Sequence, residues 1–133
     1  MGGRRAGIAV GLVAVLGLMG APAAAAPRLS VEVGDVGTIV EGGGAVIVSL
    51  TVRCPRGPYE VLEAHASASQ DSASGMGGFA PTCGGRARTY AVRVSSFGDP
   101  FVAGSATAGG FVLMLHRDGS TISASDTETI TLE

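Results

Sequence analysis

The strict alternation of apolar and polar side chains between Ala45 and Cys54 constrains this chain more than any other feature of its sequence. The segment reads AVIVSLTVRC, and one face of it carries Val46, Val48, Leu50, Val52 and Cys54. The opposite face carries Ile47, Ser49, Thr51 and Arg53. Successive side chains of a β-strand point to opposite faces, whereas a helix would scatter these residues around its axis. The segment therefore predicts a half-buried strand whose inward row ends on a cysteine.

The same period of two recurs along the chain. Three further segments alternate in this way, namely Arg28–Val33, Arg88–Ser95 and Thr127–Glu133. The inward residues that this pattern predicts are Leu29, Val31, Val33, Tyr90, Val92, Val94, Ile130 and Leu132. Threonine at positions 127, 129 and 131 suits the outward row of the last strand, because β-branched side chains favour an extended backbone.

Two segments have patterns that fit more than one structure. Tyr59–Gln70 contains helix-forming Glu, Leu and Ala, yet it also alternates, with Leu62, Ala64, Ala66 and Ala68 on one side. We favour a strand there, because the alternation runs through the segment. Phe111–Leu115 reads FVLML, and this continuous apolar run fits either a fully buried strand or one turn of helix.

Turn-forming sequences separate these segments. They are GDVG at 34–37, EGGG at 41–44, CPRGP at 54–58, FGDP at 97–100 and RDGS at 117–120. Asp118-Gly119 favours a hairpin turn, and the Ser/Gly-rich residues 70–78 predict an exposed loop between the two cysteines. About seven short strands with turns between them predict an all-β fold, an antiparallel immunoglobulin-like sandwich.

Residues 1–25 predict a secretory signal peptide. Arg4 and Arg5 supply its positive start, Ala6–Met19 its apolar stretch, and Pro22 with the alanines after it the small residues for cleavage. The apolar stretch is shorter than the roughly 20 residues that a membrane span needs. Because proline is poorly tolerated just after the cut, Pro27 favours cleavage after Ala25. We expect a secreted protein without a stable membrane anchor, whose single domain covers residues 26–133.

The charge of these 108 residues bears on the partners they attract. They contain seven arginines, no lysine and eleven acidic residues, which gives a net charge of −4. A mildly acidic protein has no overall electrostatic attraction to nucleic acid or to anionic membranes. We therefore expect no nucleic-acid partner.

Cys54 and Cys83 are the only cysteines in the chain. Outside the cell, an even number of cysteines at this spacing predicts a disulfide, with two free buried thiols as the alternative. The chain-entropy model gives such a loop of about 29 residues a stabilisation of roughly 3–4 kcal/mol. A redox-active pair would usually have the CxxC spacing, which this pair does not have.

The sequence contains no recognisable constellation of catalytic or metal-binding residues. His65 and His116 lack the HxH or HxxxH spacing of zinc and copper sites, and the serines lack GxSxG or SxxK contexts. Asp126 and Glu128 share one strand face, and we interpret them as a solvated edge rather than an acid–base pair. We expect no enzyme and no cofactor.

Four apolar side chains are candidates for a ligand or partner surface: Phe79, Phe97, Phe101 and Met76. Phe97 and Phe101 flank the Gly98-Asp99-Pro100 turn, where they either pack on each other or face a ligand. A planar row of aromatic rings, as in many sugar-binding modules, is not evident because the chain has no tryptophan.

Several segments resemble a group of known proteins. These are TVRCP (Thr51–Pro55), PTCGG (Pro81–Gly85), TYAVRV (Thr89–Val94) and FVAGSATA (Phe101–Ala108). With them, and with Gln70, the chain resembles small secreted proteins of high-GC Gram-positive bacteria that have an immunoglobulin-like β-sandwich and one disulfide. The resemblance implies a fold and an extracellular location, and it supplies no catalytic residues. In size and composition the chain also resembles the secreted enediyne carriers, which have two disulfides.

Three functions of different classes are compatible with this sequence. The first is a non-enzymatic secreted protein that binds a protein or cell-envelope partner through its surface. The second is a carrier with a cleft for a small ligand, lined by Phe79, Phe97, Phe101 or Met76. The third is a secreted hydrolase, which would need His65 or His116 within reach of a serine and a carboxylate. A sandwich fold is compatible with all three.

Overall fold

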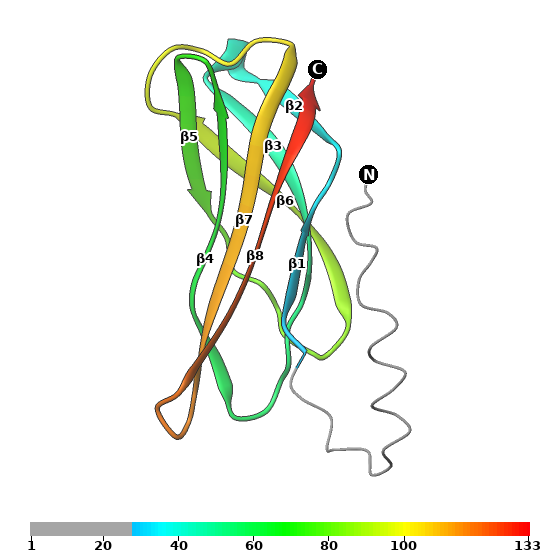
Figure 1. Cartoon of the computed structure of the whole chain (residues 1–133), viewed down its shortest axis with the longest axis vertical. Coiled ribbons are helices and arrows are strands. Elements are labelled where there is room, and N and C mark those ends of the chain that lie inside the picture. The colour runs from blue at the N-terminus through cyan, green and yellow to red at the C-terminus, as the bar shows by residue number, and fades with distance from the viewer. Residues whose placement is uncertain (1–27) are drawn as a thin grey trace, which may run out of the picture.

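The computed structural model describes residues 28–133, which form eight β-strands and one short 3-10 turn. The elements are β1 (Ser30–Val33), β2 (Val36–Val40), η2 (Glu41–Gly43), β3 (Ala45–Arg53), β4 (Tyr59–Gln70), β5 (Ala73–Gly78), β6 (Ala87–Ser96), β7 (Gly104–His116) and β8 (Thr121–Leu132). The all-β prediction is confirmed (Figure 1). The predicted signal peptide lies outside the described residues. Within them, no helix has the length and apolar character to cross a membrane.

Seven of the strands form a closed ring of hydrogen-bonded neighbours. The order is β3, β2, β8, β7, β4, β5 and β6, and β6 pairs with β3 again. Long antiparallel ladders join β3 to β6 and link β5, β4, β7 and β8 in series. Figure 1 shows β4, β5 and β7 in front of β3 and β6, so the ring is an elongated, flattened barrel.

The two layers of this barrel are connected by short pairings. β5 meets β6 through Gly75–Ser96 and Met76–Ser95, and β2 meets β8 through two residue pairs. The β2–β8 pairing is parallel, so the prediction of a wholly antiparallel sheet is wrong at this edge. The sequence pattern did not predict that the sheet closes into a ring either. The β5–β6 and β2–β8 pairings that close it join segments that are far apart in the chain.

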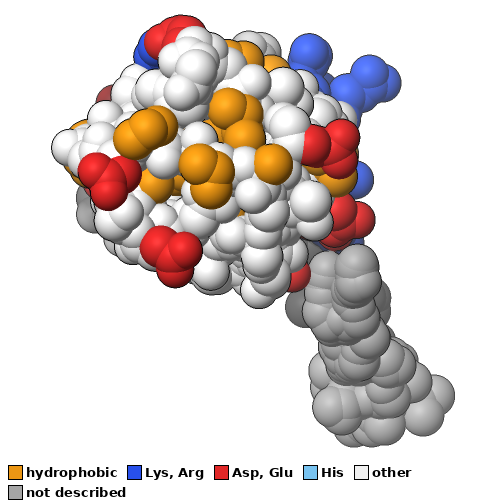
Figure 2. Space-filling model, turned by 90° about the horizontal axis from the view of Figure 1, so that it is seen from above, with side chains coloured by type: hydrophobic (Ala, Val, Ile, Leu, Met, Phe, Trp, Pro, Cys, Tyr) orange, Lys and Arg blue, Asp and Glu red, His pale blue; other side chains and the backbone are white. Residues whose placement is uncertain are grey.

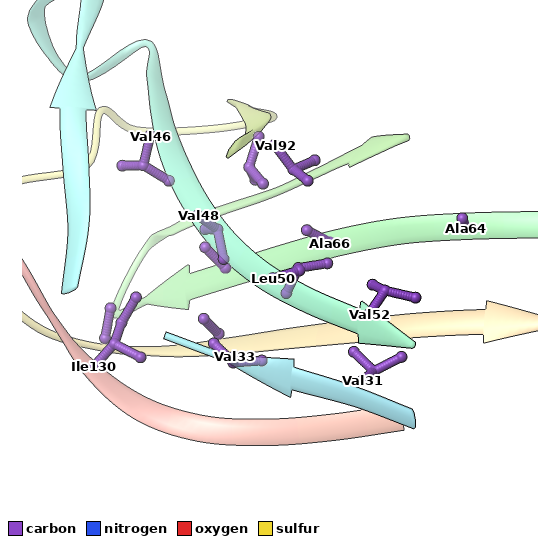
Figure 3. Packing of buried hydrophobic residues seen from close by; sticks show 14 of the residues in the cluster. Val31, Val33, Val46, Val48, Leu50, Val52, Ala64, Ala66, Val92 and Ile130 are labelled. Atoms are coloured by element: carbon purple, nitrogen blue, oxygen red, sulfur yellow. The ribbon is translucent and has the colours of Figure 1, made fainter. Parts of the chain in front are cut away.

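The inward rows predicted from alternation form the core. Val46, Val48, Leu50, Val52 and Cys54 are all buried, and their outward neighbours are partly exposed. The predicted core residues of β1, β6 and β8 are also buried, except Leu29 and Tyr90, which are half-buried against the core. Figure 3 shows Val31 and Val33 of β1 beside the β3 row, where their register partners are Val52 and Leu50. These predictions are confirmed.

Phe111–Leu115 belongs to a strand, β7, rather than to a helical turn. Val112 and Met114 point into the core and are fully buried. Phe111, Leu113 and Leu115 lie on the outer face and are half-buried by the neighbouring strands β4 and β8. The run is therefore continuously apolar because its outer residues, too, are half-buried among the side chains of the two neighbouring strands.

A β-bulge in β4 reverses the predicted orientation of Leu62. The pairing with β7 passes from Val61–Met114 to Glu63–Leu113, which leaves Leu62 as the extra residue. Its side chain is 49 % exposed, while Ala64, two positions later, points inward as predicted. One inserted residue shifts the phase of the alternation, and the inward position before the bulge belongs to Val61.

The prediction of an exposed loop over residues 70–78 is wrong for most of that range. Ala73–Gly78 is strand β5, which pairs with β4 from His65–Gly78 to Gln70–Ala73. The glycines do not loosen this segment. They let its backbone approach β6, because a Cβ atom on Gly77 would lie 2.9 Å from the carbonyl carbon of Arg93 and closer still to its oxygen.

Strand β8 begins at Thr121, before the predicted segment, and its inward row includes Asp126 and Glu128. β8 pairs with β7 along its whole length on one side, and on its other side it pairs with β2 only at Thr131 and Leu132, so both carboxylates stand, half-buried, beside an edge that carries no ladder partner among the described residues. Asp126 Oδ2 accepts a hydrogen bond of 2.8 Å from the backbone N–H of Val33. The carboxylate thereby links β1 to β8 and satisfies a donor that would otherwise be costly to bury.

The predicted disulfide is present. Cys54, at the end of the inward row of β3, is bonded to Cys83 in the β5–β6 loop, with Cα atoms 4.9 Å apart. The backbone N–H of Gly85 donates to the carbonyl oxygen of Cys54 at 2.9 Å. The bond and this contact together fix the β5–β6 loop against the end of β3.

Candidate functional site

The outer face of β8, β7, β4 and β5 carries serine and threonine side chains in aligned rows. Thr129, Thr107, Ser69 and Ser74 are successive register partners across the four strands, and all four are exposed. We call this surface the hydroxyl face. Its hydroxyl residues are Ser67, Ser69, Ser74, Ser105, Thr107, Ser123, Ser125, Thr127, Thr129 and Thr131. The face arises because each of these strands alternates a small polar residue with a core residue.

A shallow pocket of about 350 Å³ interrupts the hydroxyl face at Gly109. Gly109 occupies the row between Thr127 on β8 and Ser67 on β4, and it has no side chain to fill its place. A Cβ atom there would lie 3.0 Å from Ser67 Oγ and 3.7 Å from Thr127 Oγ1. The floor of the pocket is therefore glycine backbone, and two hydroxyl groups stand on its sides.

His65 and Phe111 form another side of the pocket. They are register partners on β4 and β7, with ring centroids 5.3 Å apart and planes inclined by 33°. His65 Nε2 lies 3.1 Å from Glu63 Oε2, which holds the imidazole in place at the pocket edge. The pocket thus combines a flat ring surface with hydroxyl donors and acceptors, a composition that suits a polyhydroxylated ring.

The four predicted surface residues do not form one site. Phe101 is only 2 % exposed and belongs to the core, so its prediction as a surface residue is wrong. Its backbone N–H donates to Gly43 at 2.9 Å, and the loop after β6 thereby inserts its ring into the end of the barrel. Phe97 is 73 % exposed at that same end.

The remaining two residues lie elsewhere. Met76 is exposed on β5 and is the register partner of Ser67, so it borders the hydroxyl face. Phe79 is half-buried against Tyr90, with ring centroids 5.4 Å apart. Two further pockets, of about 400 and 310 Å³, lie near His116 and near Gln70. Within residues 28–133, none of the three pockets described is lined by any of the four predicted side chains.

His116 lies near both a carboxylate and a serine. Its Nδ1 is 2.9 Å from Asp118 Oδ1 and accepts a hydrogen bond from the Asp118 backbone N–H. Ser120 Oγ donates to Asp118 Oδ1 at 2.6 Å. The carboxylate therefore stands between the serine and the histidine, whereas nucleophilic catalysis needs the histidine next to the serine. These contacts close the β7–β8 turn.

This turn leads to a prediction about pKa. The hydrogen bonds from the Ser120 side chain and backbone lower the pKa of Asp118, with a smaller contribution from His116. Ser120→Ala is expected to raise this pKa toward its ordinary value, because the hydroxyl no longer stabilises the carboxylate. A carboxylate with a lowered folded-state pKa stabilises the fold above its unfolded-state pKa. This contribution is lost as the pH falls through the folded-state pKa.

An NMR titration of the Asp118 carboxyl carbon measures the effect. The control is His116→Ala, for which we expect a smaller rise. A larger rise for His116→Ala than for Ser120→Ala would contradict the assignment of Ser120 as the main cause.

Within the described residues, no group of three His, Cys, Asp or Glu side chains is arranged to hold a metal ion. Comparison of the chain with protein-family models, curated proteins and solved structures found no match. The candidate site therefore depends on its own geometry. Sequence reasoning identified the outward threonines of β8 but missed the pocket, because nothing local in the sequence aligns Gly109 with Ser67 and Thr127.

Proposed function

We propose that this protein is a secreted, non-enzymatic binding protein that holds an uncharged glycan of the cell envelope on its hydroxyl face. The observation that carries the proposal is the pocket at Gly109, between the His65–Phe111 rings and the hydroxyls of Ser67 and Thr127. A sugar ring offers C–H groups to an aromatic face and hydroxyl groups to polar side chains. The pocket supplies both on a rigid sheet.

The aligned hydroxyl rows support an extended ligand rather than a single sugar. The row from Thr129 to Ser74 crosses four strands without a charged side chain, and the row beside it contains the pocket. Each Ser or Thr hydroxyl both donates and accepts hydrogen bonds, so such a row matches the hydroxyl groups along a neutral polymer. A charged partner would find no compensating charge along these rows.

Secretion and an immunoglobulin-like arrangement are parts of this proposal. The Cys54–Cys83 disulfide supports an oxidising location, as does the sequence of residues 1–25. The immunoglobulin-like arrangement is supported by the grouping of β1, β3 and β6 on one side and of β5, β4, β7 and β8 on the other.

Affinity electrophoresis of the purified protein in gels containing α-glucan, β-glucan, galactan or mannan tests the proposal. We expect at least one of these neutral polysaccharides to retard the protein. Gly109→Ala places a methyl group on the floor of the pocket, 3.0 Å from Ser67 Oγ, and Thr127→Val removes one hydroxyl group while keeping the side-chain shape. Each is expected to weaken binding about tenfold, the first because the methyl group keeps the sugar ring away from the glycine backbone. The second loses one hydrogen bond of roughly 1 kcal/mol or somewhat more.

The matched control is Thr38→Val, which makes the same change at an exposed position of β2 outside the hydroxyl face and is expected to bind within about twofold of the unchanged protein. Retardation by none of the four polysaccharides would overturn the proposal. Undiminished binding by Gly109→Ala would do so as well. Recovery of a protein partner whose binding resists both pocket substitutions would favour a protein–protein function.

A further inference from the structure

The arginines gather at one end of the barrel, although the net charge of the chain is negative. Six of the seven arginines in residues 28–133 lie where β1 and β6 begin, where β3 ends, and in the β3–β4 and β7–β8 connections (Figure 1). The opposite end carries Glu41, Asp71, Asp99 and Glu133. Figure 2 views that end and shows acidic side chains around a hydrophobic patch.

Five of these arginines lie at the end of the barrel that carries the disulfide, and we call them the arginine cluster: Arg28, Arg53, Arg56, Arg86 and Arg88. The β3–β6 register places Arg53 opposite Ala87, on the outer face of the sheet, while Arg88 is the partner of Val52 and belongs to the alternate row at the end of the barrel. Arg53 Nη1 donates to the carbonyl oxygen of Gly85 at 3.1 Å. Ser30 is the register partner of Arg53, which places the start of β1, with Arg28, at the same end.

The disulfide joins the two connections that carry Arg56 and Arg86. Cys54 lies between Arg53 and Arg56, and Cys83 lies three residues before Arg86. Their Cα atoms are 4.9 Å apart, so the β3–β4 and β5–β6 connections are joined at this point. Arg56 and Arg86 therefore extend from two connections that are covalently joined, rather than from independent loops.

These arginines are not neutralised by neighbouring carboxylates. Within residues 28–133, no ion pair joins a member of the cluster to an acidic side chain. Arg93, which lies on β6 like Arg88, pairs with Glu41. Arginines gathered at one end of a molecule make the local potential positive, which attracts a ligand of opposite charge. The cluster is thus arranged for an anionic partner.

We propose that the arginine cluster binds a flexible polymer that carries phosphate groups along its length. A guanidinium group matches a phosphate with two parallel hydrogen bonds and remains charged at every physiological pH. Five such groups spread over strand ends and connections fit repeated phosphates better than a single ion. The large exposed apolar side chains of the described residues all lie outside residues 54–58 and 79–88, so these connections lack the anchors that lipid insertion requires.

Binding of the purified protein to a fluorescent inorganic polyphosphate chain, measured at several salt concentrations, tests this proposal. If five phosphates are contacted, the logarithm of the binding constant is expected to fall with the logarithm of the salt concentration with a slope of about −3.5. The variant Arg56→Gln/Arg86→Gln/Arg88→Gln is expected to bind about a hundredfold more weakly at low salt, with a slope of about −1.4.

The matched control is Arg93→Gln, which removes an arginine already paired with Glu41 and is expected to bind within about twofold of the unchanged protein. Circular dichroism checks that each variant is folded. The proposal is overturned if polyphosphate does not bind at low salt, or if the triple variant binds as well as the unchanged protein.

Parallel measurements separate the sources of phosphate. Monophosphate, vesicles of anionic phospholipid and duplex DNA are compared with polyphosphate at equal phosphate concentration. Tighter binding to any of these three would overturn the assignment to a flexible polymer. Thr127→Val changes the pocket at Gly109 and is expected to leave polyphosphate binding unchanged. The tests of glycan binding and of polyphosphate binding can therefore fail separately.

Discussion

Replacing Gly77 with alanine is expected to lower the free energy of unfolding by about 3 kcal/mol, the upper part of the range for overpacking. A Cβ atom at this position would lie 2.9 Å from the carbonyl carbon of Arg93 and 3.3 Å from the Cα atom of Val94. All these neighbours are backbone atoms of β6, so no side-chain rotation can relieve the clash. Strand β5 would have to move away from β6.

The large effect follows from the position of β5 in the barrel. β5 joins β4 to β6 and so closes the ring on one side, but it meets β6 through two residue pairs only. Gly75, the other glycine facing β6, makes an equally close approach to the carbonyl group of Ser95. A displacement of β5 would therefore weaken both its pairing with β4 and the contact with β6 that closes the ring.

Gly78→Ala is the matched control for this prediction. The nearest atom to a Cβ at Gly78 is the carbonyl oxygen of Ala64, at an ordinary contact distance of 3.6 Å. We expect its free energy of unfolding to change by no more than about 0.5 kcal/mol. Denaturant unfolding followed by circular dichroism measures both variants. Equal stabilities of Gly77→Ala and Gly78→Ala would show that β5 does not pack closely on β6.

Removing the disulfide is expected to have an effect of similar size. In Cys54→Ala/Cys83→Ala the unfolded chain is no longer closed over 29 residues, which lowers the free energy of unfolding by roughly 3–4 kcal/mol. Truncating the buried Cys54 side chain adds a smaller loss of packing. For a domain of this size the melting temperature should fall by roughly 15 °C.

Reduction provides the control for the cysteine variant. A reductant should lower the melting temperature of the unchanged protein by a similar amount and leave that of the double variant unaltered. Intact mass with thiol alkylation under denaturing conditions verifies the state of the cysteines. Two alkylatable thiols before reduction, or a melting temperature that does not respond to reductant, would contradict the prediction.

The disulfide also connects stability with the proposed polyanion site. Because Cys54 and Cys83 join the connections that carry Arg56 and Arg86, the double variant frees these two arginines from each other, whereas Arg53 stays opposite Ala87 in the β3–β6 ladder. Loss of this bond would then weaken polyphosphate binding without removing any positive charge. The hydroxyl face lies on other strands and does not depend on this bond.

Local periodicity predicted most of the strands and failed at identifiable places. The rows of β1, β3 and β6 were correct because alternation reports directly which side of a strand is apolar. The inward orientation predicted for Leu62 was wrong, because a bulge inserts one residue into β4 without any local signal in the sequence. β5 was missed because its glycines resemble a loop, although their small size serves the approach of its backbone to β6.

The chain's own residues therefore determined the all-β class, the inward side of most strands and the pairing of its two cysteines. Each of these follows from neighbouring residues or from a simple count. Closure of the ring, the parallel β2–β8 contact and the alignment of Gly109 with Ser67 and Thr127 depend on register between distant segments. The gathering of six arginines at one end of the barrel likewise exists only in three dimensions, because a net charge sums the side chains without their positions.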